Sequence, residues 1–191
     1  AIFLIISNQT KSLFSEEKGF YLISVLAIFT FHYGYFLALK LAPLLNVFLI
    51  INLTGLFIIF YAKFMYNLKI RIEHVIALIL NMLAVLLVAL HKENNNQLYQ
   101  YKYLGYFAAF IAVNAWAFYS AKISSYKLKN QFSIIISCFY VFVMVVIFLF
   151  IKGDIENLLN LALRDYLLCA VIGIFSMGGS FLCWNYGMAN G

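Results

Sequence analysis

Residues 131–151 read QFSIIISCFYVFVMVVIFLFI, a stretch without a single Asp, Glu, Lys or Arg. A helix needs about 20 mostly apolar residues to cross the hydrocarbon core of a bilayer. The stretch lacks the apolar/polar alternation that marks the strands of a membrane barrel. It therefore predicts a transmembrane α-helix, and we interpret the rest of the chain outward from it.

Five further apolar runs of similar length accompany this one. They cover residues 19–39, 41–62, 72–90, 103–121 and 166–188. Short polar segments separate most of the runs, and a longer polar linker occupies residues 91–102. We therefore predict an all-α, polytopic transmembrane helical bundle with about six full spans.

The composition supports lipid as the solvent of this chain. Of its 191 residues, 65% are hydrophobic and 10% are charged. A soluble domain carries about 25% charged residues, so a soluble fold of this composition would lack polar surface. In lipid, the backbone polar groups must pair within the protein, which helices achieve. The lipid bilayer is thus the first predicted partner.

The formal net charge of +6 does not indicate a nucleic-acid partner, because the basic residues are scattered between apolar runs. Cytoplasmic loops of membrane proteins carry an excess of Lys and Arg. One set of loops holds Lys11, Lys18, Lys63, Lys69, Arg71, Lys122, Lys127 and Lys129, and the other holds Lys40, Lys92, Lys102, Lys152 and Arg164. The first, larger set is predicted to be cytoplasmic.

Residues 152–165 form the connection between the last two runs. Their apolar residues Ile155, Leu158, Leu159 and Ala162 recur at helical spacing. A short helix at the membrane interface and an ordinary loop are both compatible with this pattern.

No catalytic set is recognisable in the sequence, so we do not predict an enzyme. The three cysteines lie in apolar runs without metal-binding spacing, and no cofactor or metal is predicted. His32 is the one ionisable residue deep in a predicted span. It is either a pathway residue or a neutral histidine that bonds a neighbouring helix.

Aromatic and amide side chains are the remaining chemistry of the spans. Tyr33, Trp116, Tyr119 and Trp184 offer rings and polar hydrogens, and Asn185 offers an amide. Such groups orient neutral, zwitterionic or aromatic solutes in a partly apolar cavity. Trp116 also fits a ring at the headgroup level. Asn81 and Asn114 are predicted to form hydrogen bonds between helices rather than to bind a ligand.

The last run separates two stripes at a spacing of four residues. Gly179, Cys183, Gly187 and Gly191 are small residues that recur every four positions and allow a second helix to approach, so we predict a packing face. Ser180 and Trp184 lie one step around and are predicted to line a pathway. The motif Gly-x-Phe-Leu occurs at 34–37 and again at 179–182, five spans apart, as in a weak inverted repeat.

Three segments resemble the EamA-type drug/metabolite transporters. Residues 103–125 (YLGYFAAFIAVNAWAFYSAKISS) resemble the opening of the second repeat of that superfamily, with Trp116, Ala117 and Tyr119 in its W-A-x-Y pattern. The ending WNYGMANG (184–191) is similar to that of helix 8 in the bacterial aromatic amino acid exporters. YGYFLALKLAP (33–43) is similar to the end of helix 3.

The resemblance implies part of a ten-helix transporter with two inverted five-helix repeats. Residues 1–90 would hold the end of helix 2 and helices 3–5 of the first repeat, and 103–191 would hold helices 6–8 of the second. The chain is then expected to be a fragment that needs its missing helices as partners. Family members carry a Pro within helix 4 and a Glu near its end, whereas residues 52–70 (NLTGLFIIFYAKFMYNLKI) have neither. Gly55 is the residue that would allow a bend there.

The predicted function is export of small metabolites by alternating access, in the bacterial cytoplasmic (inner) membrane. The resemblance implies aromatic or other neutral amino acids as substrates. The predicted cavity residues are Tyr33, Trp116, Tyr119, Trp184 and Asn185. No Asp or Glu lies deep in a predicted span, which favours downhill efflux. The alternative function is that of a non-catalytic membrane subunit in a larger complex.

Overall fold

The computed structural model describes residues 16–67, 69–90, 99–124, 133–153 and 155–190. The helix tail predicted at residues 1–6, the linker residues 91–98 and Gly191 lie outside the described residues.

The described residues form helices and contain no strand. The helices are α2 (Lys18–Leu41), α3 (Leu44–Asn52), α4 (Thr54–Tyr66), α5 (Ile72–Leu90), α6 (Lys102–Ser124), α7 (Ile134–Lys152), α8 (Ile155–Leu159), α9 (Leu163–Val171), the π-helix η3 (Ile172–Gly179) and α10 (Ser180–Asn190). The all-α prediction is thus confirmed, and the connection at residues 152–165 contains the short helix α8.

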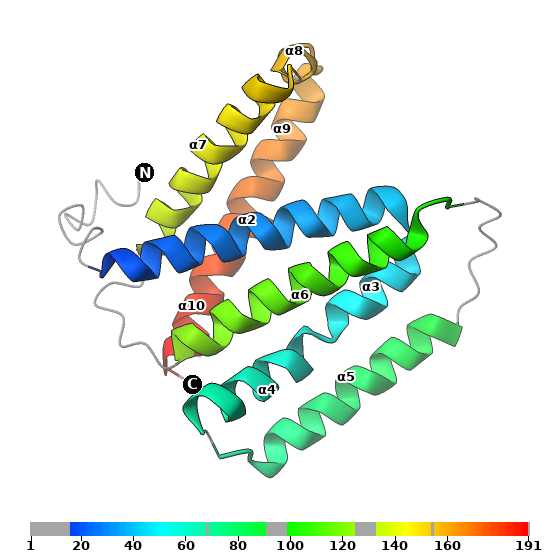
Figure 1. Cartoon of the computed structure of the whole chain (residues 1–191), viewed down its shortest axis with the longest axis vertical. Helices are drawn as coiled ribbons and strands as arrows, with labels where there is room; N and C mark the ends of the chain where they lie inside the picture. The colour runs from blue at the N-terminus through cyan, green and yellow to red at the C-terminus, as the bar shows by residue number, and fades with distance from the viewer. Residues whose placement is uncertain (1–15, 68, 91–98, 125–132, 154, 191) are drawn as a thin grey trace. The chain divides into compact units, whose positions relative to one another are not determined.

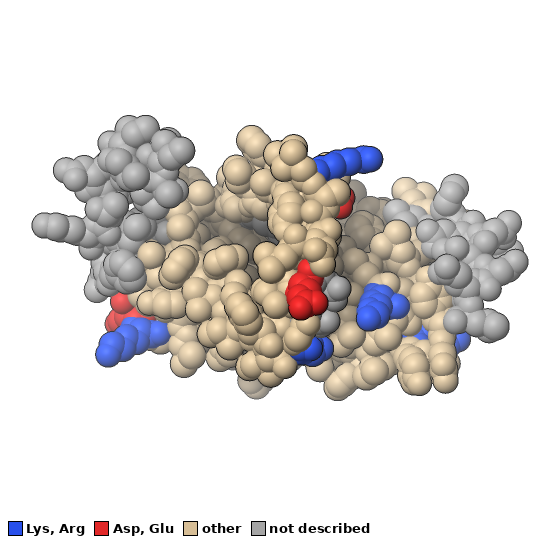
Figure 2. Space-filling model, turned by 90° about the horizontal axis from the view of Figure 1, so that it is seen from above, with Lys and Arg blue, Asp and Glu red and all other residues tan. Residues whose placement is uncertain are grey.

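Among the described residues, five helical segments are long and apolar enough to cross a membrane. They cover Lys18–Leu41, Leu44–Tyr66, Lys102–Ile123, Ile134–Lys152 and Leu163–Met188. The sixth predicted run forms α5, whose apolar part Ile72–Leu87 counts as a shorter apolar helix. Sixteen residues rise about 24 Å, less than the roughly 30 Å of a bilayer core. Uncharged residues make up almost all of the described surface in Figure 2, and these features together indicate an integral membrane protein.

The chain divides into two compact units. One comprises Leu26–Ser125, and the other comprises Ala1–Val25 with Tyr126–Gly191, as far as these residues are described. We call them the α6 unit and the α7 unit. The family resemblance assigns the helices of the α6 unit to two different repeats. The two divisions are compatible, because units defined by contacts need not follow a repeat. The repeat assignment stays a prediction.

In the α6 unit, α6 is the central helix. It packs against α3 and α4, and α5 lies beyond these two helices (Figure 1). The part of α2 after Leu26 crosses α6 through a seam of small residues, with Gly34 and Ala38 on α2 and Ala42 directly after it, at every fourth position.

The seam brings two backbones unusually close. A Cβ on Gly34 would lie 2.9 Å from the Ala108 carbonyl oxygen and 3.1 Å from the Ala112 Cβ. A Cβ on Gly105 would lie 2.7 Å from the Ala42 Cβ. Small residues drive helix association in membranes because they permit such close van der Waals contact. The two backbones therefore approach closely at this α2–α6 seam, which the sequence interpretation did not identify.

In the α7 unit, the short helix α8 connects α7 to α9, and these two helices form a helical hairpin (Figure 1). The segments α9, η3 and α10 follow one another without a gap, and α10 also contacts α7. The predicted glycine stripe lies on the last of these segments. A Cβ on Gly187 would meet nothing within 4 Å, and one on Gly179 would meet only Ile174 O of its own helix region, at 3.6 Å. Among the described residues no helix packs tightly on these two glycines.

Candidate functional site

The span Leu44–Tyr66 is broken in its middle. The helix α3 ends at Asn52, α4 begins at Thr54, and Leu53 stands between them with φ −68° and ψ −6°. The Leu53 N–H donates to the Ile50 carbonyl oxygen at 3.0 Å, an i to i−3 bond in place of the usual i−4 bond. The span is thus interrupted without a proline, two positions before Gly55.

Side chains satisfy the carbonyl groups around this break. Asn81 Nδ2 of α5 donates to the Asn52 carbonyl oxygen at 2.7 Å, and Asn52 Nδ2 donates to the Phe48 carbonyl oxygen at 2.8 Å. The Thr54 hydroxyl donates to the Ile51 carbonyl oxygen. A broken helix is tolerated at membrane depth where neighbouring groups re-satisfy its backbone. The prediction that Asn81 bonds between helices is confirmed, and its partner is the break itself.

Replacing Asn81 by alanine should destabilise the α6 unit, because the Asn52 carbonyl would lose its donor. Hydrogen bonds between membrane helices contribute about 0.6 to 1.7 kcal/mol. Unfolding by SDS in mixed micelles measures this loss. Asn52→Ala is the matched control, because it removes an amide that bonds only within α3 among the described contacts. An equal loss in both variants would contradict a special role for Asn81.

A cluster of aromatic rings lies where α2 crosses α6. The Phe31 ring centroid lies 5.2 Å from that of Trp116, and Trp116 lies 5.3 Å from Tyr119. Tyr35 stacks on Phe31 at 6.1 Å. Trp116 is 8% exposed and Tyr119 is 1% exposed. Ring pairs at these distances attract one another beyond the area they bury. Trp116 and Tyr119 are thus brought together, and the sequence interpretation missed Phe31.

Tyr33 lies on another side of α2. It stacks on Phe29 at 5.7 Å and is 44% exposed. Tyr33 is two positions from both Phe31 and Tyr35, which places it about 200° around the helix from each of them. Tyr33 therefore does not join the Phe31–Trp116–Tyr119 cluster.

His32 bonds to its own helix. Its Nδ1 lies 2.7 Å from the Ile28 carbonyl oxygen, and a carbonyl only accepts, so Nδ1 is the protonated nitrogen. This bond does not require the imidazolium form, because the neutral tautomer with hydrogen on Nδ1 makes it equally.

The opposite side of α6 faces α4. The Tyr61 hydroxyl donates to Asn114 Oδ1 at 2.8 Å, and the Tyr61 ring meets Phe118 edge-on at 5.9 Å. The prediction that Asn114 bonds a neighbouring helix, away from Trp116, is confirmed. The helix α6 thus touches the aromatic cluster on one side and the broken span on the other.

The α7 unit carries the other predicted cavity residues on α10. Asn185 is 1% exposed, Trp184 is half-buried and Ser180 is exposed. The segment before them, Ile172–Gly179, is a π-helix. The sequence interpretation assumed α-helical spacing throughout and missed it. Rare π segments often mark functional sites.

Two buried serines were also missed. Ser133 and Ser137 have no exposed surface, and neither hydroxyl finds a hydrogen-bond partner among the described residues. Buried hydroxyls are nearly always paired. These serines therefore join the candidate site residues of the α7 unit.

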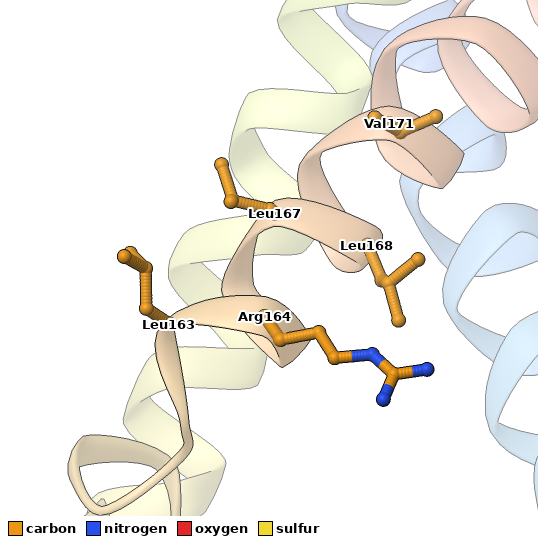
Figure 3. A pocket seen from close by; sticks show the side chains of 5 residues that line it. All are labelled: Leu163, Arg164, Leu167, Leu168 and Val171. Atoms are coloured by element: carbon orange, nitrogen blue, oxygen red, sulfur yellow. The ribbon is translucent and has the colours of Figure 1, made fainter.

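A hollow of about 380 Å³ runs along α9. It is lined by Leu163, Arg164, Leu167, Leu168 and Val171. Figure 3 shows Leu163 and Leu167 on one side of this helix and Arg164 with Leu168 on the other. All five belong to one exposed helix and none is a predicted cavity residue, so we assign no function to the hollow. Among the described residues no group of three His, Cys, Asp or Glu is placed to hold a metal.

Comparison with known proteins gives one likeness in fold. No protein-family model and no curated protein matches the chain. A solved crystal structure, described only as that of a protein, is similar over 97% of this chain with a TM-score of 0.76 and 22% identity. The chain spans 65% of the length of that structure. At this identity the likeness concerns the fold alone.

Proposed function

We propose that this chain is part of an EamA-type drug/metabolite transporter that exports small neutral metabolites by alternating access. The broken span Leu44–Tyr66 is the observation that carries the proposal. Leu53 lies near the middle of that span, where lipid offers no hydrogen bonds to an interrupted backbone. Discontinuous helices at mid-membrane are characteristic of transporters, in which they form solute and ion sites.

The aromatic cluster supports the substrate class. Phe31, Trp116 and Tyr119 provide ring faces. Ring faces suit an aromatic or apolar side chain. We propose aromatic or other neutral amino acids as substrates. Trp184 and Asn185 of α10 are proposed to bind the solute as well, whereas Tyr33 lies on another side of α2 from the aromatic cluster. Asn185 would bond the polar end of the solute.

The bacterial inner membrane is the proposed location, with the end that carries Lys63, Lys69 and Arg71 facing the cytoplasm. This orientation depends on the Lys and Arg count of the loops and on the positive-inside rule.

Downhill efflux is the proposed mode of transport. An imposed pH gradient should therefore not drive accumulation of the solute in liposomes, and His32→Gln should leave the initial rate within about twofold. The reason is that His32 is bonded to its own backbone and no carboxylate lies deep in a described span to relay a proton, since Asp165 is in the first turn of α9. Accumulation that follows the pH gradient and is lost in His32→Gln would contradict this.

A solute panel tests the proposal against its alternative, a non-catalytic membrane subunit. The full-length protein in liposomes should exchange labelled aromatic amino acids faster than neutral aliphatic ones, and those faster than Lys or Glu. Empty liposomes provide the baseline. No exchange of any solute, together with stable partner proteins on purification, would favour the subunit.

A further inference from the structure

One end of the α6 unit gathers basic residues. The helix α4 ends there, α5 begins there and α6 ends there (Figure 1). The cations at this end are Lys63, Lys69, Arg71 and Lys122, and Glu73 is the one acidic residue among the described positions there. The local charge is therefore strongly positive, which favours an anionic partner.

The turn between α4 and α5 is held by its own hydrogen bonds. Asn67 adopts the left-handed conformation (φ 50°, ψ 32°), and its N–H donates to the Ala62 carbonyl oxygen. Lys63 Nζ donates to Asn67 Oδ1 at 3.3 Å. The Arg71 N–H donates to His74 Nδ1 at 3.0 Å, which closes the first turn of α5. Hydrogen bonds thus end α4 at Asn67 and begin α5 at Arg71, and Lys69 and Arg71 are both exposed.

Large apolar side chains are interleaved with these cations. Phe64 is 80% exposed, Ile70 is 51% exposed and Ile72 is 68% exposed. In water this pattern would be unfavourable. At a membrane surface it is favourable, because apolar side chains enter the acyl region while Lys and Arg stay at the level of the phosphates.

The opposite end of the α6 unit differs. It carries Lys40 at the end of α2 and Lys102 at the start of α6. Lys102 Nζ already lies over the Tyr103 ring, 5.3 Å from its centroid. Lys40 and Lys102 therefore match Lys69 and Arg71 in charge, at the other end of the unit.

We propose that the α4–α5 turn binds the headgroup of an anionic phospholipid, with Lys69 and Arg71 at its phosphate and Phe64 and Ile70 against its acyl chains. Arginine suits this role because its planar guanidinium matches two phosphate oxygens. The turn lies on the side that the Lys and Arg count predicts to be cytoplasmic, where anionic lipid is attracted to basic segments beside membrane spans.

Native mass spectrometry of the delipidated, full-length protein tests this, with phosphatidylglycerol as the probe and phosphatidylcholine as the neutral reference. Lys69→Gln with Arg71→Gln should weaken phosphatidylglycerol binding roughly 25-fold, from the usual contribution of two basic residues at an anionic surface. The charge-preserving pair Lys69→Arg with Arg71→Lys should bind within a few-fold of wild type. Phosphatidylcholine binding should not change.

Lys40→Gln with Lys102→Gln is the control, since it removes the same charge from the other end. Equal weakening by both double variants would overturn the proposal, because only net charge would then matter. Unchanged binding in Lys69→Gln with Arg71→Gln would also overturn it. Inorganic phosphate in excess should fail to displace the lipid, and full displacement would indicate a site for free anions instead.

Discussion

Gly34→Ala is expected to destabilise the α6 unit by about 1 to 3 kcal/mol, the usual cost of an extra methyl group in a well-packed interior. The new Cβ would lie 2.9 Å from the Ala108 carbonyl oxygen. That oxygen is backbone, so relief requires the two helices to separate. Separation would also loosen the contact of Phe31 with Trp116, which lies across the same α2–α6 crossing. SDS unfolding in mixed micelles measures the loss.

Gly55→Ala provides the matched control, because Gly55 is also a helical glycine of the α6 unit and its Cβ would meet nothing within 4 Å. Alanine is favoured over glycine inside a helix by about 1 kcal/mol. The two substitutions should therefore change stability in opposite directions. A Gly34→Ala protein as stable as Gly55→Ala would show that the α2–α6 seam is not the tight contact described here.

Trp116→Ala is expected to slow transport of an aromatic amino acid roughly tenfold at low solute concentration. The loss of one stacked ring costs about 0.5 to 1.5 kcal/mol, and 1.4 kcal/mol corresponds to a factor of ten. Initial rates with labelled phenylalanine in liposomes measure the effect. The rate with a neutral aliphatic amino acid should fall less, because its side chain has no ring to stack.

Two variants separate a role in solute binding from a role in stability. Trp116→Phe keeps a ring between Phe31 and Tyr119 and should retain most of the rate. Phe107→Ala removes a ring of the same helix that is 60% exposed. It lies nine residues away, about half a turn around the helix, and should leave transport unchanged. Equal losses in Phe107→Ala and Trp116→Ala would contradict a special role for the cluster.

The sequence was sufficient to predict the helices, because the length of an apolar run depends on one continuous segment alone. The uncharged stretch at residues 131–151 predicts a span, and α7 covers most of this stretch, from Ile134 to Lys152. Asn81 and Asn114 were also predictable as interhelical donors or acceptors, since an amide in lipid must find a partner. These inferences need only one residue and its surroundings.

Features that depend on two helices at once could not be predicted. The sequence around Gly34 does not show that Ala108 lies opposite it, and the sequence around Phe31 does not show that its ring contacts Trp116. The break at Leu53 occurs without the proline of the family pattern. Asn81, 29 positions from Asn52 along the chain, instead donates a hydrogen bond to the Asn52 carbonyl oxygen. The π-helix at 172–179 depends on a backbone register that no side-chain pattern here records.

Efflux of labelled tryptophan, phenylalanine, tyrosine and threonine from cells that express the full-length gene product is the most direct test of the proposed function. Trp184→Ala and Asn185→Ala, at equal protein levels in the membrane, accompany the wild type. The proposal predicts faster efflux of the three aromatic amino acids than from cells without the protein, and its loss in both variants. Efflux no faster than in cells without the protein, from a well-expressed wild type, would contradict the transporter proposal.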